Sequence, residues 1–275
     1  MTLSRRDFLR ISAAAGIAGT AVACGLLDDD NGPDRIDYGD SGSQFGDLYV
    51  PSGDPRGTVV LLHGGAWEAD EDLSIVKPVA QDLRREGYVV WNVEYRRVGQ
   101  PGGGWPGTFD DTGAAIDHLA TIAEDHPVDL DRVVVVGHSA GGTLALWAAA
   151  REGTVQPRGY LSLAGFTDLE ACVEEGLLAG SCANVLGGTP AEVPARYREA
   201  SPAARLPTGR RQGLVHGIDD DIVPVRQSQD YAALAQAAGD PAQLVTVPNA
   251  GHFQLIDIQH PAYGEVLTQI SRLLN

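Results

Sequence analysis

The residues with the clearest chemical meaning in this chain of 275 residues form the pentapeptide Gly137-His138-Ser139-Ala140-Gly141. The pentapeptide follows four valines and precedes an apolar, Ala- and Leu-rich segment, so it is predicted to turn sharply from a strand into a helix. A serine in such a turn lies at the helix start, where backbone N–H groups without helical partners can face developing negative charge. This context predicts a nucleophilic serine, Ser139.

A nucleophilic serine needs a base and an acid that orients the base, and in this strand and helix context the acid precedes the histidine along the chain. His252 lies in a Gly-marked loop just after the last predicted strand, and it is the expected base. Three consecutive aspartates, Asp219, Asp220 and Asp221, follow the preceding predicted strand. Neighbouring side chains in a loop point in different directions, so one of the three is expected to meet the imidazole.

Alternating strand and helix patterns must position these residues. Apolar, β-branched-rich runs bounded by Gly or Pro predict central strands over residues 58–62, 88–93, 132–136, 160–163, 213–215 and 243–247, after two short extended pieces at 35–38 and 44–50. Helical patterns cover residues 73–85, 110–123, 140–151, 226–238 and 263–274. Strands that are apolar throughout and alternate with helices predict an α/β fold with a mostly parallel central sheet and helices on both faces.

The composition is that of an ordinary globular chain and excludes one class of partner. Hydrophobic residues make up 43% and charged residues 21%, which suits a folded domain rather than a disordered or polytopic membrane protein. The chain has 20 Lys and Arg against 37 Asp and Glu, a net charge of -17. Nucleic acids need a basic surface that displaces counterions, so DNA and RNA are not expected partners.

The first 23 residues have the pattern of an export signal. Arg5 and Arg6, followed by an uncharged apolar stretch too short to span a bilayer, resemble the twin-arginine signal, which exports folded proteins. Residues 21–25 resemble a bacterial lipobox, which predicts lipidation of Cys24, although Ala21 stands where the lipobox prefers leucine and plain cleavage stays open. The protein is therefore expected outside the cytoplasm, held at the membrane only by lipid on Cys24, or alternatively soluble in the periplasm or secreted.

The remaining chain is expected to form one domain with an insertion. Residues 24–37 are charged, contain Gly and Pro and lack periodicity, so they predict a flexible tether before a domain over residues 38–275. Residues 167–206 break the alternation and predict a cap-like insertion over the carboxyl edge of the sheet. The insertion contains Cys172 and Cys182, which outside the cytoplasm are expected to form a disulfide. Zinc binding, the competing interpretation, would need a nearby His or third Cys, and the sequence offers neither.

From about residue 38 onward the chain resembles an α/β-hydrolase of the esterase and lipase group. The resemblance rests on the pentapeptide around Ser139 and on the segments at 63–67, 92–96, 186–190, 201–202, 216–224 and 251–252. It implies a triad of Ser139, Asp220 and His252, because relatives carry the acid four residues after the histidine of H-G-x-x-D-x-x-V-P. The H-G-G-A-W form at 63–67 is also similar to kynurenine formamidases and to carbohydrate acetyl or feruloyl esterases.

The resemblance further implies an oxyanion hole built partly by residues 63–67. Glycines there let the backbone approach a substrate carbonyl, so the N–H of Gly65 or Ala66 is expected to join that of Ala140. Trp67 and His138 are the expected pocket residues, with Trp67 on the acyl side. The first residue of the motif, a histidine, is expected to pack beneath the loop rather than to catalyse.

Together these features predict a serine hydrolase that cleaves a small neutral carboxylic ester through an acyl-enzyme intermediate. The expected partner is a small-molecule ester or acyl substrate, with no metal or organic cofactor, and a monomer is the default state. An arylformamidase-like amide hydrolase would use the same triad. A lipoprotein that uses the scaffold only for binding is the alternative from another class, and it would predict a broken triad, which the sequence does not show.

Overall fold

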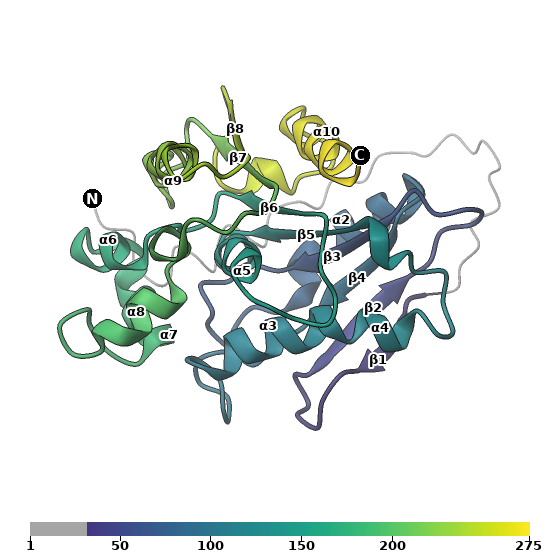
Figure 1. Cartoon of the computed structure of the whole chain (residues 1–275), viewed down its shortest axis with the longest axis horizontal. Coiled ribbons are helices and arrows are strands. Elements are labelled where there is room, and N and C mark those ends of the chain that lie inside the picture. The colour runs from purple at the N-terminus through teal and green to yellow at the C-terminus, as the bar shows by residue number, and fades with distance from the viewer. Residues whose placement is uncertain (1–31) are drawn as a thin grey trace, which may run out of the picture. The chain divides into compact units, whose positions relative to one another are not determined.

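The structure is a computed structural model that describes residues 32–275. The expected signal peptide at 1–23 and the expected lipidation site Cys24 lie outside the described residues. Residues Pro33–Asn275 form one unit in which strands and helices alternate (Figure 1). Among the described residues, no helix is long and apolar enough to cross a membrane.

A sheet of eight strands organises this unit, in the order β1-β2-β4-β3-β5-β6-β7-β8. β2 pairs antiparallel with β1 and β4, and the other neighbours pair in parallel, which confirms the predicted α/β fold with a mostly parallel sheet. The strands are β1 Asp34–Asp37, β2 Phe45–Tyr49, β3 Thr58–Leu62, β4 Val89–Val93, β5 Val133–His138, β6 Gly159–Leu163, β7 Gln212–Gly217 and β8 Ala242–Val247. Each of them overlaps a predicted extended segment.

Helices cover both faces because alternate side chains of each strand point to opposite sides. On β5, Val133 and Val135 belong to the hydrophobic cluster that includes α3 and α5, whereas Val134 and Val136 belong to the cluster that includes α2 and α10. All four valines are fully buried, which explains why this run shows no alternation of polar and apolar residues. The helices of these layers are η1 Leu73–Val76, α2 Lys77–Arg85, α3 Gly107–Asp117, α4 Leu119–Ile122, η2 Leu130–Arg132, α5 Ala140–Ala149, α9 Arg226–Ala237, η5 Phe253–Leu255 and α10 Ala262–Leu274.

The helix predicted over residues 110–123 starts earlier and is interrupted. α3 begins at Gly107 and ends at Asp117, and α4 follows after His118. The early start is stabilised by Thr108, whose Oγ1 accepts from Gly104 N (3.0 Å) and donates to Arg96 O (2.5 Å). Both partners precede the helix, so a periodicity pattern does not reveal them.

The tether predicted over residues 24–37 is wrong at its C-terminal end, because residues 34–37 form β1. The extended piece predicted at 35–38 corresponds to β1, a mostly exposed edge strand that pairs with β2 and so belongs to the domain rather than to the tether. Its attachment depends on Arg35, whose Nε lies 2.8 Å from Asp47 Oδ1 on β2. The same guanidinium lies over the Phe45 ring at 4.0 Å.

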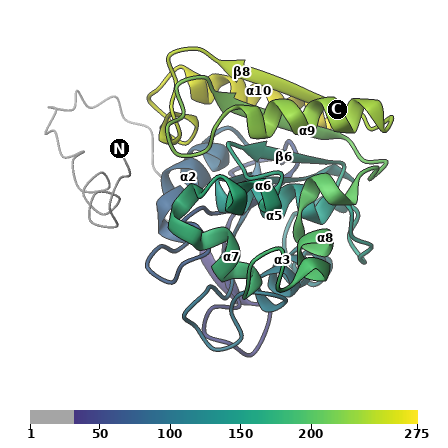
Figure 2. The same cartoon turned by 90° about the vertical axis from the view of Figure 1, so that its left-hand side faces the viewer.

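Residues 167–206 form short helices between β6 and β7. They are α6 Leu169–Glu174, η3 Leu177–Gly180, α7 Ser181–Leu186, α8 Pro194–Ala200 and η4 Pro202–Arg205, with α6, α7 and α8 close together in Figure 2. A disulfide joins Cys172 on α6 to Cys182 on α7, with 6.4 Å between their Cα atoms. The segment also contacts the loops that follow β3 and β4, since Asn184 Nδ2 donates to Glu68 Oε1 (3.3 Å) and Trp105 N donates to Val185 O (2.7 Å).

Candidate active site

Ser139 joins the end of β5 to the start of α5, with φ 55° and ψ -120°. A non-glycine residue in such a conformation costs about 1–3 kcal/mol, and it persists only where the surroundings hold it. Here Ser139 N donates to Leu163 O on β6 (2.8 Å), and α5 runs so close to β3 that a Cβ on Gly141 would lie 2.2 Å from Leu62 O. The serine is 5% exposed, so this strained turn holds a hydroxyl just beneath the surface.

A hydrogen bond joins the expected base to one of the three candidate acids. His252 Nδ1 donates to Asp220 Oδ2 (2.8 Å), and the other carboxylate oxygen accepts from Ile222 N (2.9 Å) and Val223 N (2.8 Å). The Asp220 carboxylate is fully buried, whereas Asp219 and Asp221 are exposed. The structure therefore brings Asp220 to His252 and leaves its two neighbours in solvent.

The surroundings of Asp220 keep its carboxylate ionised. Burial by itself would raise the pKa of Asp220, but hydrogen bonds from His216 and His252 and from the Val223 N–H lower this pKa well below its usual range. An ionised carboxylate holds the proton of His252 on Nδ1, so Nε2 carries the lone pair. That is the tautomer a general base requires.

A second imidazole contacts the same carboxylate. His216 Nε2 lies 3.3 Å from Asp220 Oδ2 and 2.9 Å from Val223 O, and its Nδ1 lies 2.7 Å from Ser228 Oγ. His216 is not among the site residues predicted from the sequence, although its spacing of four residues from Asp220 across a tight turn could have suggested this contact. Among residues 32–275, no group of three or more His, Cys, Asp or Glu side chains is arranged to hold a metal ion.

The two expected pocket residues are both buried. His138 is 1% exposed, and its Nε2 donates to His252 O (3.0 Å) while the two rings lie 4.7 Å apart between centroids. Burial and the charge of His252 lower the pKa of His138 to about 3, so this ring is neutral near pH 7. Trp67 is 0% exposed and its ring lies 6.2 Å from that of Phe166. Neither side chain presents an open surface to a substrate, and His138 instead supports the base.

The loop after β3 lies against the nucleophile. A Cβ on Gly64 would lie 3.2 Å from Ser139 Cβ, so backbone and serine are in near contact. In the part of the chain that the structure describes, the N–H groups of Gly65, Ala66 and Ala140 donate no hydrogen bond. The expected oxyanion donors are thus unpaired, in the loop that contacts Ser139 and in the residue that follows this serine.

The nucleophile and the base are linked through one residue. His138 precedes Ser139 directly and hydrogen bonds to the His252 backbone, so both reactive side chains lie at the same end of the sheet. Within residues 32–275, no hydrogen bond joins Ser139 Oγ to His252 Nε2. Catalytic hydrogen bonds in enzymes without substrate are often long and shorten only when substrate binds.

Comparison with known proteins identifies the family of this constellation. The BD-FAE family model matches residues 47–234, which include the nucleophile turn and the acid loop. The chain belongs to the BD-FAE family. Its relatives include esterases and a kynurenine formamidase, and the solved structures that it resembles include α/β-hydrolase esterases, in agreement with the fold.

Individual relatives of this BD-FAE protein are distant. Esterase LipC of Mycobacterium tuberculosis is 26% identical over 245 residues, 81% of this chain and 60% of LipC. The kynurenine formamidase avaC of Aspergillus versicolor is 26% identical over 231 residues, 70% of this chain and 80% of that protein. A solved esterase of Thermogutta terrifontis with bound propionate has a TM-score of 0.71 at 21% identity, and the match covers 89% of this chain and 94% of that one. The chain spans about three fifths of the length of LipC.

Proposed function

We propose that this BD-FAE protein is a serine hydrolase that cleaves small neutral carboxylic esters. The observation that carries the proposal is the 2.8 Å hydrogen bond between Asp220 and His252, beside a strained, nearly buried Ser139. Esterases among its relatives support the reaction class. The fold alone would not support a particular reaction, because one fold can carry many different functions.

In the proposed mechanism Ser139 Oγ attacks the ester carbonyl while His252 Nε2 takes its proton. The ionised carboxylate of Asp220 stabilises the imidazolium that forms. The negative charge on the tetrahedral oxygen is stabilised by the N–H groups of Ala140 and of Gly65 or Ala66, each worth about 3 kcal/mol. The imidazolium then protonates the leaving alkoxide, and a water activated by His252 releases the acyl group.

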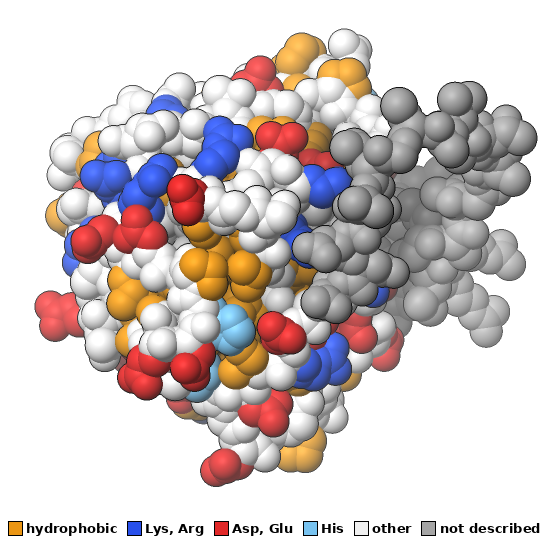
Figure 3. Space-filling view, turned by 90° about the vertical axis from the view of Figure 1, so that its right-hand side faces the viewer, with side chains coloured by type: hydrophobic (Ala, Val, Ile, Leu, Met, Phe, Trp, Pro, Cys, Tyr) orange, Lys and Arg blue, Asp and Glu red, His pale blue; other side chains and the backbone are white. Residues whose placement is uncertain are grey.

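The net negative charge of the chain supports a neutral substrate. The chain has a net charge of -17, and on the face shown in Figure 3 acidic and basic side chains are intermixed. A field of this sign slows the approach of polyanions and has little effect on a neutral ester.

A formamide substrate is the second candidate, favoured by the kynurenine formamidase among the relatives. The same triad would attack the formyl carbonyl. p-Nitrophenyl esters from acetyl to octanoyl, compared with N-formylkynurenine and an acetylated xylo-oligosaccharide, separate these substrates by kcat/KM. A value for N-formylkynurenine above that for every ester would replace the ester proposal.

The nucleophile is tested with a fluorophosphonate probe. We expect the protein to be labelled, and Ser139→Ala to abolish labelling and to lower kcat at least about a thousandfold. Failure of the intact protein to react, together with absence of hydrolysis, would favour a non-catalytic binding protein. Labelling that survives in the Ser139→Ala variant would show that another residue is the nucleophile.

The acid is tested with a matched pair in one loop. Asp220→Asn removes the charge that holds the His252 tautomer, so kcat is expected to fall about ten-thousandfold. Asp221→Asn changes the adjacent exposed carboxylate and is expected to keep kcat within about twofold. Equal losses in both variants would contradict the assignment of Asp220.

A further inference from the structure

The loop that follows β3, residues 63–73, has an unusual backbone. Three consecutive residues have positive φ, namely Gly65 (104°), Ala66 (53°) and Trp67 (60°). For alanine and tryptophan this left-handed region is costly, so the conformation must be held by contacts from outside the loop. This same loop supplies the expected oxyanion donors, whose positions decide how well they stabilise a transition state.

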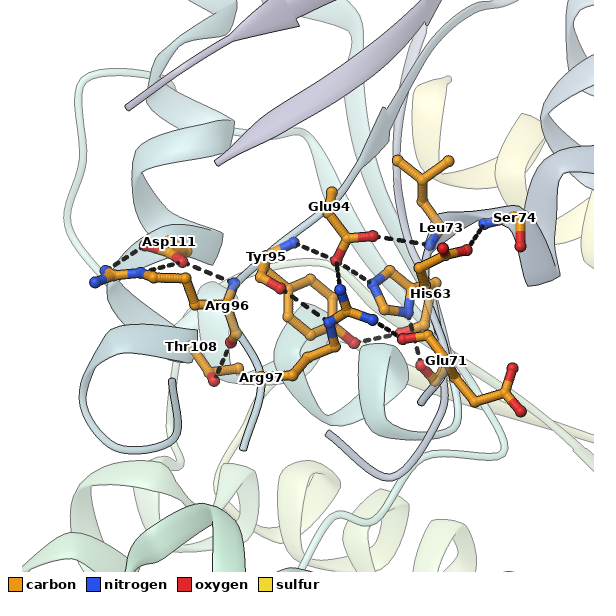
Figure 4. A network of polar contacts seen from close by, with 12 residues as sticks. His63, Glu71, Leu73, Ser74, Glu94, Tyr95, Arg96, Arg97, Thr108 and Asp111 are labelled. Carbon is orange, nitrogen blue, oxygen red and sulfur yellow. Dashed lines mark hydrogen bonds and ion pairs between the residues drawn. The ribbon is translucent and has the colours of Figure 1, made fainter. Parts of the chain in front are cut away.

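One buried carboxylate contacts both ends of this loop. The parallel register pairs Leu62 with Val93, so the next residues on each strand, His63 and Glu94, lie side by side. Glu94 is 2% exposed, and its Oε1 lies 3.2 Å from His63 Nε2 at the loop start. Its Oε2 accepts from Leu73 N (3.0 Å) at the loop end (Figure 4). Glu94 therefore joins the two ends of the 63–73 loop. We call Glu94, together with Tyr95 and Arg97, the clamp.

Two neighbours of Glu94 reinforce the clamp. Tyr95 Oη donates to His63 O (2.7 Å), and the Tyr95 and His63 rings stack at 4.2 Å with an interplanar angle of 8°. Arg97 Nη2 lies 3.0 Å from Glu94 Oε1, and its Nη1 donates to the backbone oxygen of Glu71 within the loop. Although burial alone would raise the pKa of Glu94, the hydrogen bond from His63 and the charge of Arg97 hold this pKa below its usual value. The clamp is thus a fully satisfied, charged network beneath the loop.

We propose that Glu94, through Tyr95 and Arg97, is the positioning residue that holds the 63–73 loop in its left-handed conformation, with its N–H groups ready for the oxyanion. This inference rests on the proposed function. The clamp contacts neither Ser139 nor His252 by any hydrogen bond or ion pair among the described residues. It acts only on the loop.

The main test is the kinetics of Glu94→Gln on p-nitrophenyl butyrate. An oxyanion donor acts in the transition state, so kcat is expected to fall at least about tenfold while KM stays within about threefold. Binding of an alkyl boronic acid, whose tetrahedral adduct places an oxygen in the oxyanion hole, is expected to weaken by a similar factor. The pKa on the acid limb of kcat/KM is expected to be unchanged, because the triad is untouched.

A milder variant and a matched control keep the test informative if Glu94→Gln does not fold. Tyr95→Phe removes only the hydroxyl contact with His63 O and keeps the ring stack, so a smaller loss of kcat with unchanged KM is expected. Asp111→Asn removes the charge of the neighbouring ion pair between the buried Asp111 and the partly exposed Arg96 (2.6 Å), which contacts no residue of the loop, and is expected to keep kcat within about twofold. A wild-type kcat in both Glu94→Gln and Tyr95→Phe would overturn the proposal.

Hydrogen exchange separates failure of this inference from failure of the proposed function. Backbone amides of residues 63–73 are expected to exchange faster in Glu94→Gln than in the wild type, while those of β7 stay protected. If the wild-type protein has no hydrolase activity but shows this exchange pattern, the esterase proposal is wrong and the proposed role of Glu94 in holding the loop stands. An active wild-type protein whose loop exchanges equally in both forms would reject the clamp alone.

Discussion

At the scale of single residues, His138 combines a structural contact with an unusual protonation state. Its Nε2 holds the backbone of His252, while its Nδ1 has no hydrogen bond partner in the described part of the chain. A protonated ring here would place a second positive charge beside the His252 imidazole. A neutral His138 therefore adds no positive charge beside the imidazolium that His252 would form in the proposed reaction.

The lowered pKa of His138 predicts a loss of stability in acid. In the folded state this pKa falls from 6.5 to about 3, so between these values the unfolded chain binds the proton and the folded chain does not. This contribution is complete above pH 6.5 and is lost as the pH falls, with a slope of about 1.4 kcal/mol per pH unit. Urea unfolding of wild type and His138→Gln between pH 4 and 6 measures it, because glutamine keeps a donor for His252 O but does not titrate. Equal slopes in the two proteins would contradict the prediction.

Some site residues can be predicted from the sequence and others need the fold. Ser139 follows from a local pattern of strand, glycine turn and helix. Among the three aspartates, the resemblance to known hydrolases singled out Asp220, but the local residues alone did not. Within one loop, a single position separates a buried side chain from an exposed one. The contact of His138 with His252 spans 114 positions, so no local pattern contains it.

At the scale of elements, the predictions succeed where a buried strand or helix requires a recognisable pattern of apolar residues. The buried strands β3 to β7 consist mostly of apolar residues, and all were predicted. β1 was predicted as an extended piece but placed in the tether, and the first turn of α3 was not predicted. Contacts such as Arg35 with Asp47 and Thr108 with Arg96 leave no periodic signal. The clamp on the 63–73 loop could have been foreseen only with the strand register, since parallel pairing brings His63 and Glu94 together.

The disulfide between α6 and α7 gives a prediction for the inserted segment. Replacing both Cys172 and Cys182 with serine is expected to lower the free energy of unfolding by about 3 kcal/mol, since the bond closes a short loop in the unfolded chain. Guanidinium titration of the wild type with and without a reducing agent should give the same difference. A reducing agent should leave the double variant unchanged, and equal midpoints for oxidised wild type and double variant would disprove a stabilising bond.

At the scale of the whole molecule, the composition and strand pattern were enough to predict the fold class, whereas the predicted location of the protein rests on residues 1–24 alone. The acidic net charge does not attach a protein to anionic lipid, so an association with the membrane would need a covalent lipid. We propose export by the twin-arginine route and lipidation of Cys24. Both involve residues outside the described part of the chain.

Export predicts two separable variants. With Arg5→Lys and Arg6→Lys together, the protein is expected to accumulate in the cytoplasm, because the paired arginines would form the export signal. With Cys24→Ser alone, it is expected to leave the cytoplasm but to appear in the soluble rather than the membrane fraction. Cell fractionation and immunoblotting measure both. Undiminished export of the double lysine variant would remove the twin-arginine assignment.

The strand order also determines when a newly made chain becomes reactive. Ser139 follows β5 and Asp220 follows β7, whereas His252 comes only after β8, the outermost strand on its side of the sheet. A ribosome delivers the hydroxyl and the carboxylate well before the proton acceptor. Under the proposed mechanism, nascent chains and fragments clipped before β8 carry a silent serine, and hydrolysis begins only when the final strand has joined the edge.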